Sequence, residues 1–188
     1  MGNVTQRHLE RTAFVPPGAP AIRLRAGRPE DAARLAAVFV SAWKRSYPGI
    51  VSAASLRGLD ENEIAVWLRT LLDSGGSTTT VAESEDHELL GFCRYGKDPN
   101  DGRKGHIFSL YVAASASGRG LGRRLLAAAL ADLEQHRLDP VTIWVFERNE
   151  LALRLYASFG FSPDGGRLVE PEYGAAEVRL RRVAKSAP

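Results

Sequence analysis

A short glycine-rich and basic segment, residues 117–124, carries the clearest chemical signal in this chain. It consists of Ser-Gly-Arg-Gly-Leu-Gly-Arg-Arg and lies between an apolar run, residues 107–112, and an amphipathic run, residues 121–133. The apolar run predicts a strand and the amphipathic run predicts a helix. Glycines let a ligand approach the backbone, and the first N–H groups of a helix lack internal partners and favour an anion. The segment therefore predicts a phosphate-binding loop.

The glycine spacing discriminates between the common phosphate loops. The dinucleotide fingerprint requires glycines at its first, third and sixth positions, and counting from Gly118 the sixth position is Arg123. The nucleoside triphosphate loop requires Gly-Lys-Ser or Gly-Lys-Thr, and this string is absent from the chain. A nucleotide-dependent oxidoreductase is therefore only a distant alternative.

A second motif follows about thirty residues after the loop, at residues 149–161. Its spacing predicts a helix, with Asn149 as the N-cap and Gly160 as the left-handed residue after its end. The Gly120-Leu121-Gly122 loop followed by this motif, in this order and at this separation, resembles the GCN5-related N-acetyltransferases. The resemblance extends from about residue 22 to residue 183, and in the second motif it rests on Asn149, Ala152, Tyr156, Gly160 and Phe161.

The resemblance implies an acyl-CoA donor, with acetyl-CoA as the acetyl source. The pyrophosphate would bind the glycine loop, while the backbone of residues 110–112 would pair with the pantetheine arm and stabilise the oxyanion. Asn149 could hydrogen-bond the pantetheine amide, cap its helix, or do both. The donor-binding residues expected on this basis are Leu110, Tyr111, Val112, Ser117, Gly118, Arg119, Gly120, Leu121, Gly122, Arg123, Asn149, Ala152 and Tyr156.

The same resemblance implies direct attack of an amine on the thioester, without an acyl-enzyme, because no cysteine lies near either motif. Tyr156 is the candidate general acid for the leaving thiolate, and periodicity alone would make it a core aromatic. His106 is the candidate general base and Glu147 is its rival. A strand-end histidine, a solvated loop acid, and a chain of waters in place of a single base are the alternatives.

Acceptor recognition is predicted near the end of the first helix. Trp43 and Tyr47 lie there, and the resemblance implies an acceptor pocket built from that helix and from residues 170–173, which include two acids. An aromatic wall with acids would suit a cationic amine. Packing of Trp43 in the core is the competing interpretation.

Three departures from the family pattern leave a second function open. Ser117 stands where the family usually has Gln or Arg, and Ala114 stands where a proline is common. His106 stands where relatives often carry a glutamate. A catalytically silent acyl-CoA-binding or sensor domain on the same fold is therefore the alternative.

The apolar pattern along the chain predicts a single mixed α/β domain, residues 21–184, with a central sheet and flanking helices. Tails are expected at residues 1–20 and 185–188. The resemblance implies a mostly antiparallel sheet whose two central strands splay apart. The pattern predicts strands at residues 22–25, 79–83, 89–95, 106–112, 141–146 and 177–183. It predicts helices at residues 29–46, 63–72, 121–133 and 149–159.

Composition limits the other function classes. The chain of 188 residues has 25 basic and 22 acidic residues, a balance that does not indicate a nucleic-acid partner. No apolar run approaches the length of a membrane helix. The chain has a single cysteine, Cys93, which excludes an internal disulfide and a cysteine metal cluster. The histidines have no metal-ligand spacing, so no metal is expected. A cytoplasmic protein is the default, and the resemblance makes a homodimer plausible.

Overall fold

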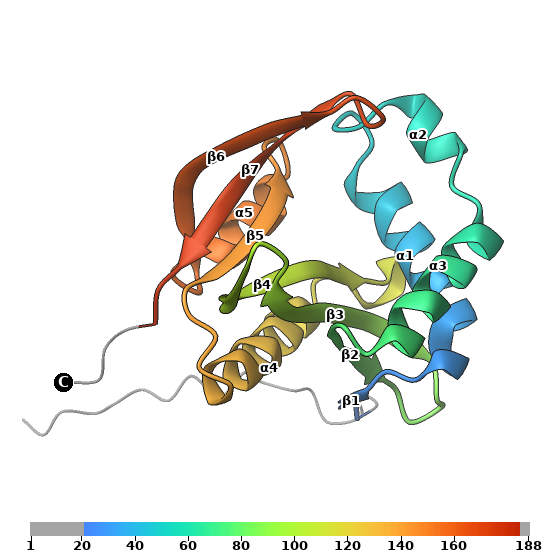
Figure 1. The fold of residues 1–188 in the computed structure, drawn as a ribbon. Coiled ribbons are helices and arrows are strands. Elements are labelled where there is room, and N and C mark those ends of the chain that lie inside the picture. The colour runs from blue at the N-terminus through green and yellow to red at the C-terminus, as the bar shows by residue number, and fades with distance from the viewer. Residues whose placement is uncertain (1–20, 185–188) are drawn as a thin grey trace, which may run out of the picture.

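The computed structural model describes residues 21–184, so the expected tails at 1–20 and 185–188 lie outside the described residues. One seven-stranded sheet runs through the molecule in the order β1-β2-β3-β4-β5-β7-β6 (Figure 1). Every neighbouring pair is antiparallel except β4 and β5, which are parallel. The strands are β1 (Arg23–Ala26), β2 (Thr78–Glu83), β3 (Leu89–Asp98), β4 (Asp101–Val112), β5 (Val141–Phe146), β6 (Ser162–Glu170) and β7 (Ala175–Arg182). The predicted fold class is confirmed.

Helices cover both faces of this sheet and enclose two apolar clusters (Figure 1). On one face α4 buries Leu125, Leu126 and Leu133 against the strands, and the spacing of these residues matches the helical period. On the other face α1 and α3 bury Leu35, Phe39 and neighbouring side chains. The helices are α1 (Ala32–Ser46), α2 (Ala53–Arg57), α3 (Glu61–Ser74), α4 (Leu121–Gln135) and α5 (Glu150–Ala157), with short 3-10 turns at Pro29–Asp31 and Ala114–Ala116.

The two central strands diverge, as the resemblance implied. β4 and β5 pair only where Gly105, His106 and Ile107 lie opposite Val141, Thr142 and Ile143. Both strands continue beyond these pairs without bonding to each other among the described residues. The register of β4 against β3 shifts at the same point, so that Phe108 is an extra residue. Because a bulge bends its strand, this extra residue accounts for the separation of β4 from β5.

The expected elements are present, with three differences. α2 was not expected because its five residues are too few to show a helical period. β6 was not expected because six of its nine residues are Ser, Pro, Asp, Gly, Gly and Arg, and it pairs at the sheet edge with a bulge. Residues 98–102 were expected to be a connection, but β3 and β4 extend into this segment and pair through Asp98 and Asp101.

Candidate active site

A cavity of about 400 Å³ opens where β4 and β5 separate. Its wall comes from the end of α1, the end of β4, the loop before α4, and α5. The residues that line it are Ala42, Arg45, Ser46, Tyr47, Leu110, Tyr111, Val112, Ala116, Ser117, Gly118, Gly120, Leu121, Gly122, Arg123, Asn149, Leu151, Ala152, Arg154, Leu155 and Tyr156. The structure thus brings both sequence motifs to one cavity, although they are separated along the chain.

The glycine loop has the geometry of an anion site. Gly118 and Gly120 adopt φ angles of 79° and 74°, in the left-handed region that side chains disfavour. Gly120 is the N-cap of α4 and provides no side-chain cap, so the first backbone N–H groups of this helix are left for another acceptor. A Cβ atom at Gly118 or Gly120 would meet no heavy atom within 4 Å, which leaves room for a ligand beside the backbone.

The three arginines of the loop have different positions. Arg123 lines the cavity, donates from Nη1 to Ser158 Oγ at 2.7 Å, and lies over the Phe159 ring at 5.0 Å. Its positive charge is therefore fixed beside the α4 N-terminus. Arg119 does not line the cavity. Arg124, which the sequence grouped with these charges, instead donates to the Ile22 carbonyl oxygen at 2.7 Å. Arg124 follows Arg123 by one residue on a helix and so points in a different direction.

The edge of β4 that faces β5 is the second wall of the site. Leu110, Tyr111 and Val112 line the cavity and pair on their other side with Cys93, Phe92 and Gly91 of β3. Their backbone has no ladder partner from β5. An extended amide ligand could therefore pair with this edge as a further strand would.

Asn149 is the N-cap of α5, as predicted. Its side-chain Oδ1 accepts a hydrogen bond from the Ala152 backbone N–H at 3.2 Å. The same side chain lines the cavity, so its amide nitrogen remains available to a ligand while the oxygen caps the helix. Gly160 has a φ of 84° just after the helix, as expected.

Tyr156 belongs both to the core and to the cavity wall. Its side chain is 5% exposed, packs in the cluster on the α4 side, and lies with its ring 5.9 Å from that of Phe161. Burial raises the pKa of Tyr156 far above its usual value, and Cys93 and Tyr111 add to this effect. The phenol is therefore protonated throughout the physiological range, which is the state a proton donor needs.

The two candidate bases lie outside the cavity lining. His106 lies where β4 and β5 are still paired, and its Nδ1 is 2.7 Å from Thr142 Oγ1 and 3.8 Å from Asp98 Oδ2. Burial lowers the pKa of His106 below its usual value, although Asp98 opposes this effect. Glu147 follows β5 and accepts a hydrogen bond from Arg167 Nη2 at 3.2 Å. The sequence placed both residues at strand ends but could not show where the strands separate.

The predicted acceptor residues lie in a larger group of aromatic rings. Tyr47 lines the cavity, whereas Trp43 is 5% exposed and packs in the cluster on the α1 side. The Trp43 ring centroid lies 4.7 Å from that of Tyr47 and 5.3 Å from that of Tyr173. Phe39 stacks on Trp43 and also packs against Tyr111. We call Phe39, Trp43, Tyr47, Tyr111, Phe146 and Tyr173 the aromatic cluster.

Sequence reasoning missed several residues around this site. Arg45 and Arg154 line the cavity. Both could have been predicted, because Arg45 lies on α1 beside the predicted acceptor residues and Arg154 lies within the second motif. Phe146 joins the aromatic cluster through β5. The position of Glu177 opposite Phe146 had no sequence signal, because β5 and β7 are separated by more than twenty residues.

Comparison with known proteins gives the family. Residues 38–161 match the acetyltransferase (GNAT) family, and this match begins within α1 and spans both motifs. The chain belongs to this family. The GNAT match confirms the resemblance drawn from residues 117–124 and 149–161. No cluster of metal-ligating side chains occurs within residues 21–184. None of the helices in that range is long and apolar enough to cross a membrane.

Similar proteins include an uncharacterized N-acetyltransferase of Bacillus subtilis, 27% identical over 89% of this chain and 93% of its own length. A probable N-acetyltransferase of Mycobacterium tuberculosis is 30% identical over 77% of this chain and 82% of its own length. Among solved structures, an N-acetyltransferase of Thermoplasma acidophilum in complex with coenzyme A superposes with a TM-score of 0.70 at 18% identity, covering 87% of this chain and 99% of the other. That likeness supports the GNAT fold.

Proposed function

We propose that this protein transfers an acetyl group from acetyl-CoA to a primary amine by direct attack. One observation carries the proposal: a single cavity joins the uncapped N-terminus of α4 to the unpaired edge of β4. The first feature suits a pyrophosphate and the second suits the amides of pantetheine. The names of the similar N-acetyltransferases support the same reaction class.

The residues of the cavity would divide the binding of the donor between them. Backbone N–H groups of residues 118–123, with the Arg123 guanidinium, would hold the pyrophosphate. The backbone of residues 110–112 and the Asn149 amide would hold the arm, with Ala152 and Leu155 as its apolar wall. When bound, the donor supplies an activated thioester carbonyl.

Catalysis would then require an oxyanion donor and a proton donor. Backbone N–H groups on the free edge of β4 would stabilise the negative oxygen that develops at the carbonyl. The Tyr156 hydroxyl would give its proton to the departing sulfur, since its burial keeps it protonated. Cys93 is buried and burial raises the pKa of its thiol, so it does not provide a thiolate for an acyl-enzyme.

Isothermal titration with acetyl-CoA, run beside NADPH and ATP, is the direct test. We expect acetyl-CoA alone to bind, with micromolar affinity, and amines then to accelerate release of free CoA thiol. Absence of acetyl-CoA binding by the folded protein would refute the donor site. Tight binding without turnover of any amine would instead favour an acyl-CoA sensor.

A further inference from the structure

Glu177 lies on β7 beside the aromatic cluster. It is the direct partner of Phe146 in the antiparallel β5–β7 pair, so the two side chains share one face of the sheet. The Phe146 ring centroid lies 5.0 Å from that of Tyr47 and 5.8 Å from that of Tyr173. The carboxylate of Glu177 therefore lies against a group of rings from α1, β5 and the β6–β7 turn.

This carboxylate has no cationic partner among residues 21–184. The nearest arginines on its own sheet are engaged elsewhere: Arg179 Nε lies 2.8 Å from Asp164 Oδ2, and Arg167 Nη2 lies 3.2 Å from Glu147 Oε2. Burial raises the pKa of Glu177 above its usual value, and the charge of Glu170 adds to this effect. A half-buried carboxylate without a partner is costly, and a cationic ligand would offset that cost.

Glu177 does not itself line the donor cavity, and the aromatic cluster connects the two. Tyr47 and Tyr111 line that cavity, and both also belong to the cluster. Burial raises the pKa of Tyr47 well above its usual value, and Tyr111, Tyr156 and Glu177 contribute to the shift. Each of these three groups therefore acts on Tyr47, which lines the donor cavity, and Tyr47 links Glu177 to that cavity.

We propose that Glu177 binds the acceptor as an ammonium ion and then takes up the proton that frees the nitrogen lone pair. The inference rests on the proposed acetyl transfer and names its acceptor class: a cationic amine whose body carries no carboxylate. Aromatic rings attract such a cation through their faces. A carboxylate on the substrate would instead be repelled by Glu170, Glu172 and Glu177, whose charges all act on Tyr173.

The proton and electron changes balance without another reactant. The ammonium gives one proton to Glu177, and the nitrogen lone pair forms the C–N bond as the carbonyl electrons move to oxygen. Collapse restores the carbonyl and breaks the C–S bond, whose electron pair leaves with sulfur. The Tyr156 hydroxyl protonates the sulfur and regains a proton from the new ammonium centre, and Glu177 releases its proton to solvent.

The test compares Glu177→Gln with Glu177→Asp in the full-length protein. We expect Gln to lower kcat/KM for an amine acceptor about 100-fold and Asp to restore part of it, while acetyl-CoA affinity stays within about twofold. Wild-type kcat/KM should fall at low pH, as the raised pKa of Glu177 requires, and Gln should remove this acidic limb. Glu170→Gln should move this limb to lower pH, because the charge of Glu170 raises the pKa of Glu177. The control Glu134→Gln, which removes an exposed carboxylate on α4, should keep both the rate and the limb.

Matched acceptors test the substrate class. Phenethylamine and phenylalanine differ by one carboxylate, as do pentylamine and 6-aminohexanoate. We expect each carboxylate-free amine to have a kcat/KM more than tenfold above that of its partner. Equal or reversed preferences would overturn the acceptor class.

The outcomes separate this inference from the proposed function. If acetyl-CoA binds and amines are acetylated, but Glu177→Gln keeps its rate and its acidic limb, Glu177 is not the base and acetyl transfer stands. The acidic limb of the pH profile could instead disappear in His106→Ala or Glu147→Gln and remain in Glu177→Gln. That result would also show that Glu177 is not the base. Failure of the wild-type protein to bind acetyl-CoA would overturn both.

Discussion

Tyr156 is the residue whose chemistry depends most on its surroundings. Its ring is buried against Phe161 while its side chain also lines the donor cavity. Phenylalanine at this position would keep the packing and remove only the ionisable hydroxyl, because the ring volume is nearly unchanged.

At this scale we predict that Tyr156→Phe lowers kcat more than about tenfold with little change in acetyl-CoA affinity, because only the proton transfer is lost. Steady-state kinetics and isothermal titration would measure the two effects. Tyr95→Phe is the matched control, since Tyr95 is also buried but its hydroxyl lies 3.2 Å from Thr80 Oγ1 and it does not line the cavity. An equal fall in kcat for both variants would contradict an acid role for Tyr156.

The element that defines the donor site is α4 with the loop before it. Gly120 fixes the N-terminus of this helix with a φ of 74°, a conformation that costs an alanine about 1–2 kcal/mol. A side chain there would also occupy the open space beside the backbone, where no other heavy atom of the protein lies within 4 Å.

At the scale of this element we predict that Gly120→Ala weakens acetyl-CoA binding about tenfold or more, since it strains the loop and fills part of the ligand space. Gly165→Ala is the matched control because Gly165 has a φ of 90° and similarly open surroundings, on β6 and outside the cavity lining. Both variants should lose thermal stability, and only Gly120→Ala should lose affinity. Titration calorimetry that showed equal affinity for both would remove the loop from the donor site.

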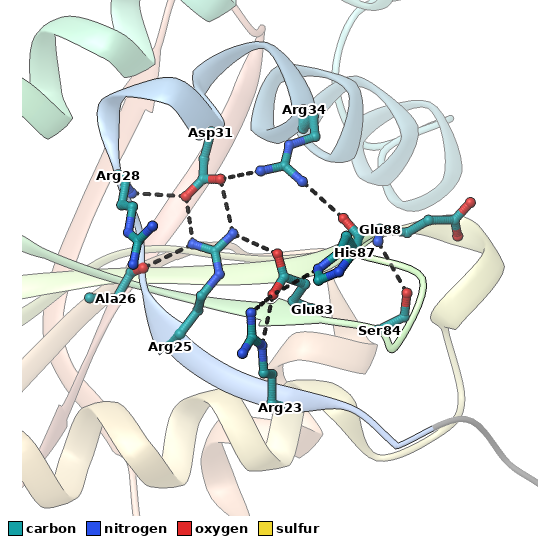
Figure 2. A network of polar contacts seen from close by, with 10 residues as sticks. All are labelled: Arg23, Arg25, Ala26, Arg28, Asp31, Arg34, Glu83, Ser84, His87 and Glu88. Carbon is teal, nitrogen blue, oxygen red and sulfur yellow. Dashed lines mark hydrogen bonds and ion pairs between the residues drawn. The ribbon is translucent and has the colours of Figure 1, made fainter.

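At the scale of the whole molecule, an ionic network joins β1, the 3-10 turn at Pro29–Asp31 and α1 to β2 (Figure 2). Arg25 bonds both Asp31 and Glu83, at 2.7 Å and 2.8 Å, and Arg23 bonds Glu83. The guanidinium groups of Arg25 and Arg23 lower the pKa of Glu83 to about 2. Burial alone would raise the pKa of Asp31, but hydrogen bonds from Arg25 and from the Arg28 backbone outweigh it and lower that pKa. The network ties β1 and α1 to β2.

A carboxyl group whose pKa is lower in the folded state than in the unfolded state stabilises the fold at pH values above its unfolded-state pKa of about 4. This stabilisation is lost as the pH falls toward the folded-state pKa. We therefore predict that the urea midpoint of the wild-type protein falls as pH decreases from about 5 toward 2. Glu83→Gln should be less stable at pH 7 and should lose less on acidification.

Urea denaturation across this pH range would provide the measurement, with Glu85→Gln as a control that removes an exposed carboxylate outside the network. Parallel pH dependences for the wild-type protein and Glu83→Gln would show that Glu83 does not contribute. If Glu85→Gln had the same pH dependence of the urea midpoint as Glu83→Gln, the effect would come from net charge rather than from the network.

The sequence by itself determined the two motifs of the proposed donor site. The glycine loop and the motif around Asn149 and Tyr156 are local patterns, since a positive φ, a helix N-cap and a helical period are all properties of neighbouring residues. They were sufficient to predict the family and the mixed sheet, and both predictions are confirmed. Most of the residues that they assigned to the donor line one cavity, and their binding role stays a prediction.

Only the tertiary structure decided the arrangement of the proposed acceptor site. The bulge at Phe108 fixes where β4 leaves β5, and therefore leaves His106 among the paired residues rather than in the cavity. Pairing of β5 with β7 sets Glu177 opposite Phe146, and α1 adds Trp43 and Tyr47 to the same cluster. These contacts join segments that are far apart along the chain, and they depend on strand register and helix packing, which no short-range pattern encodes.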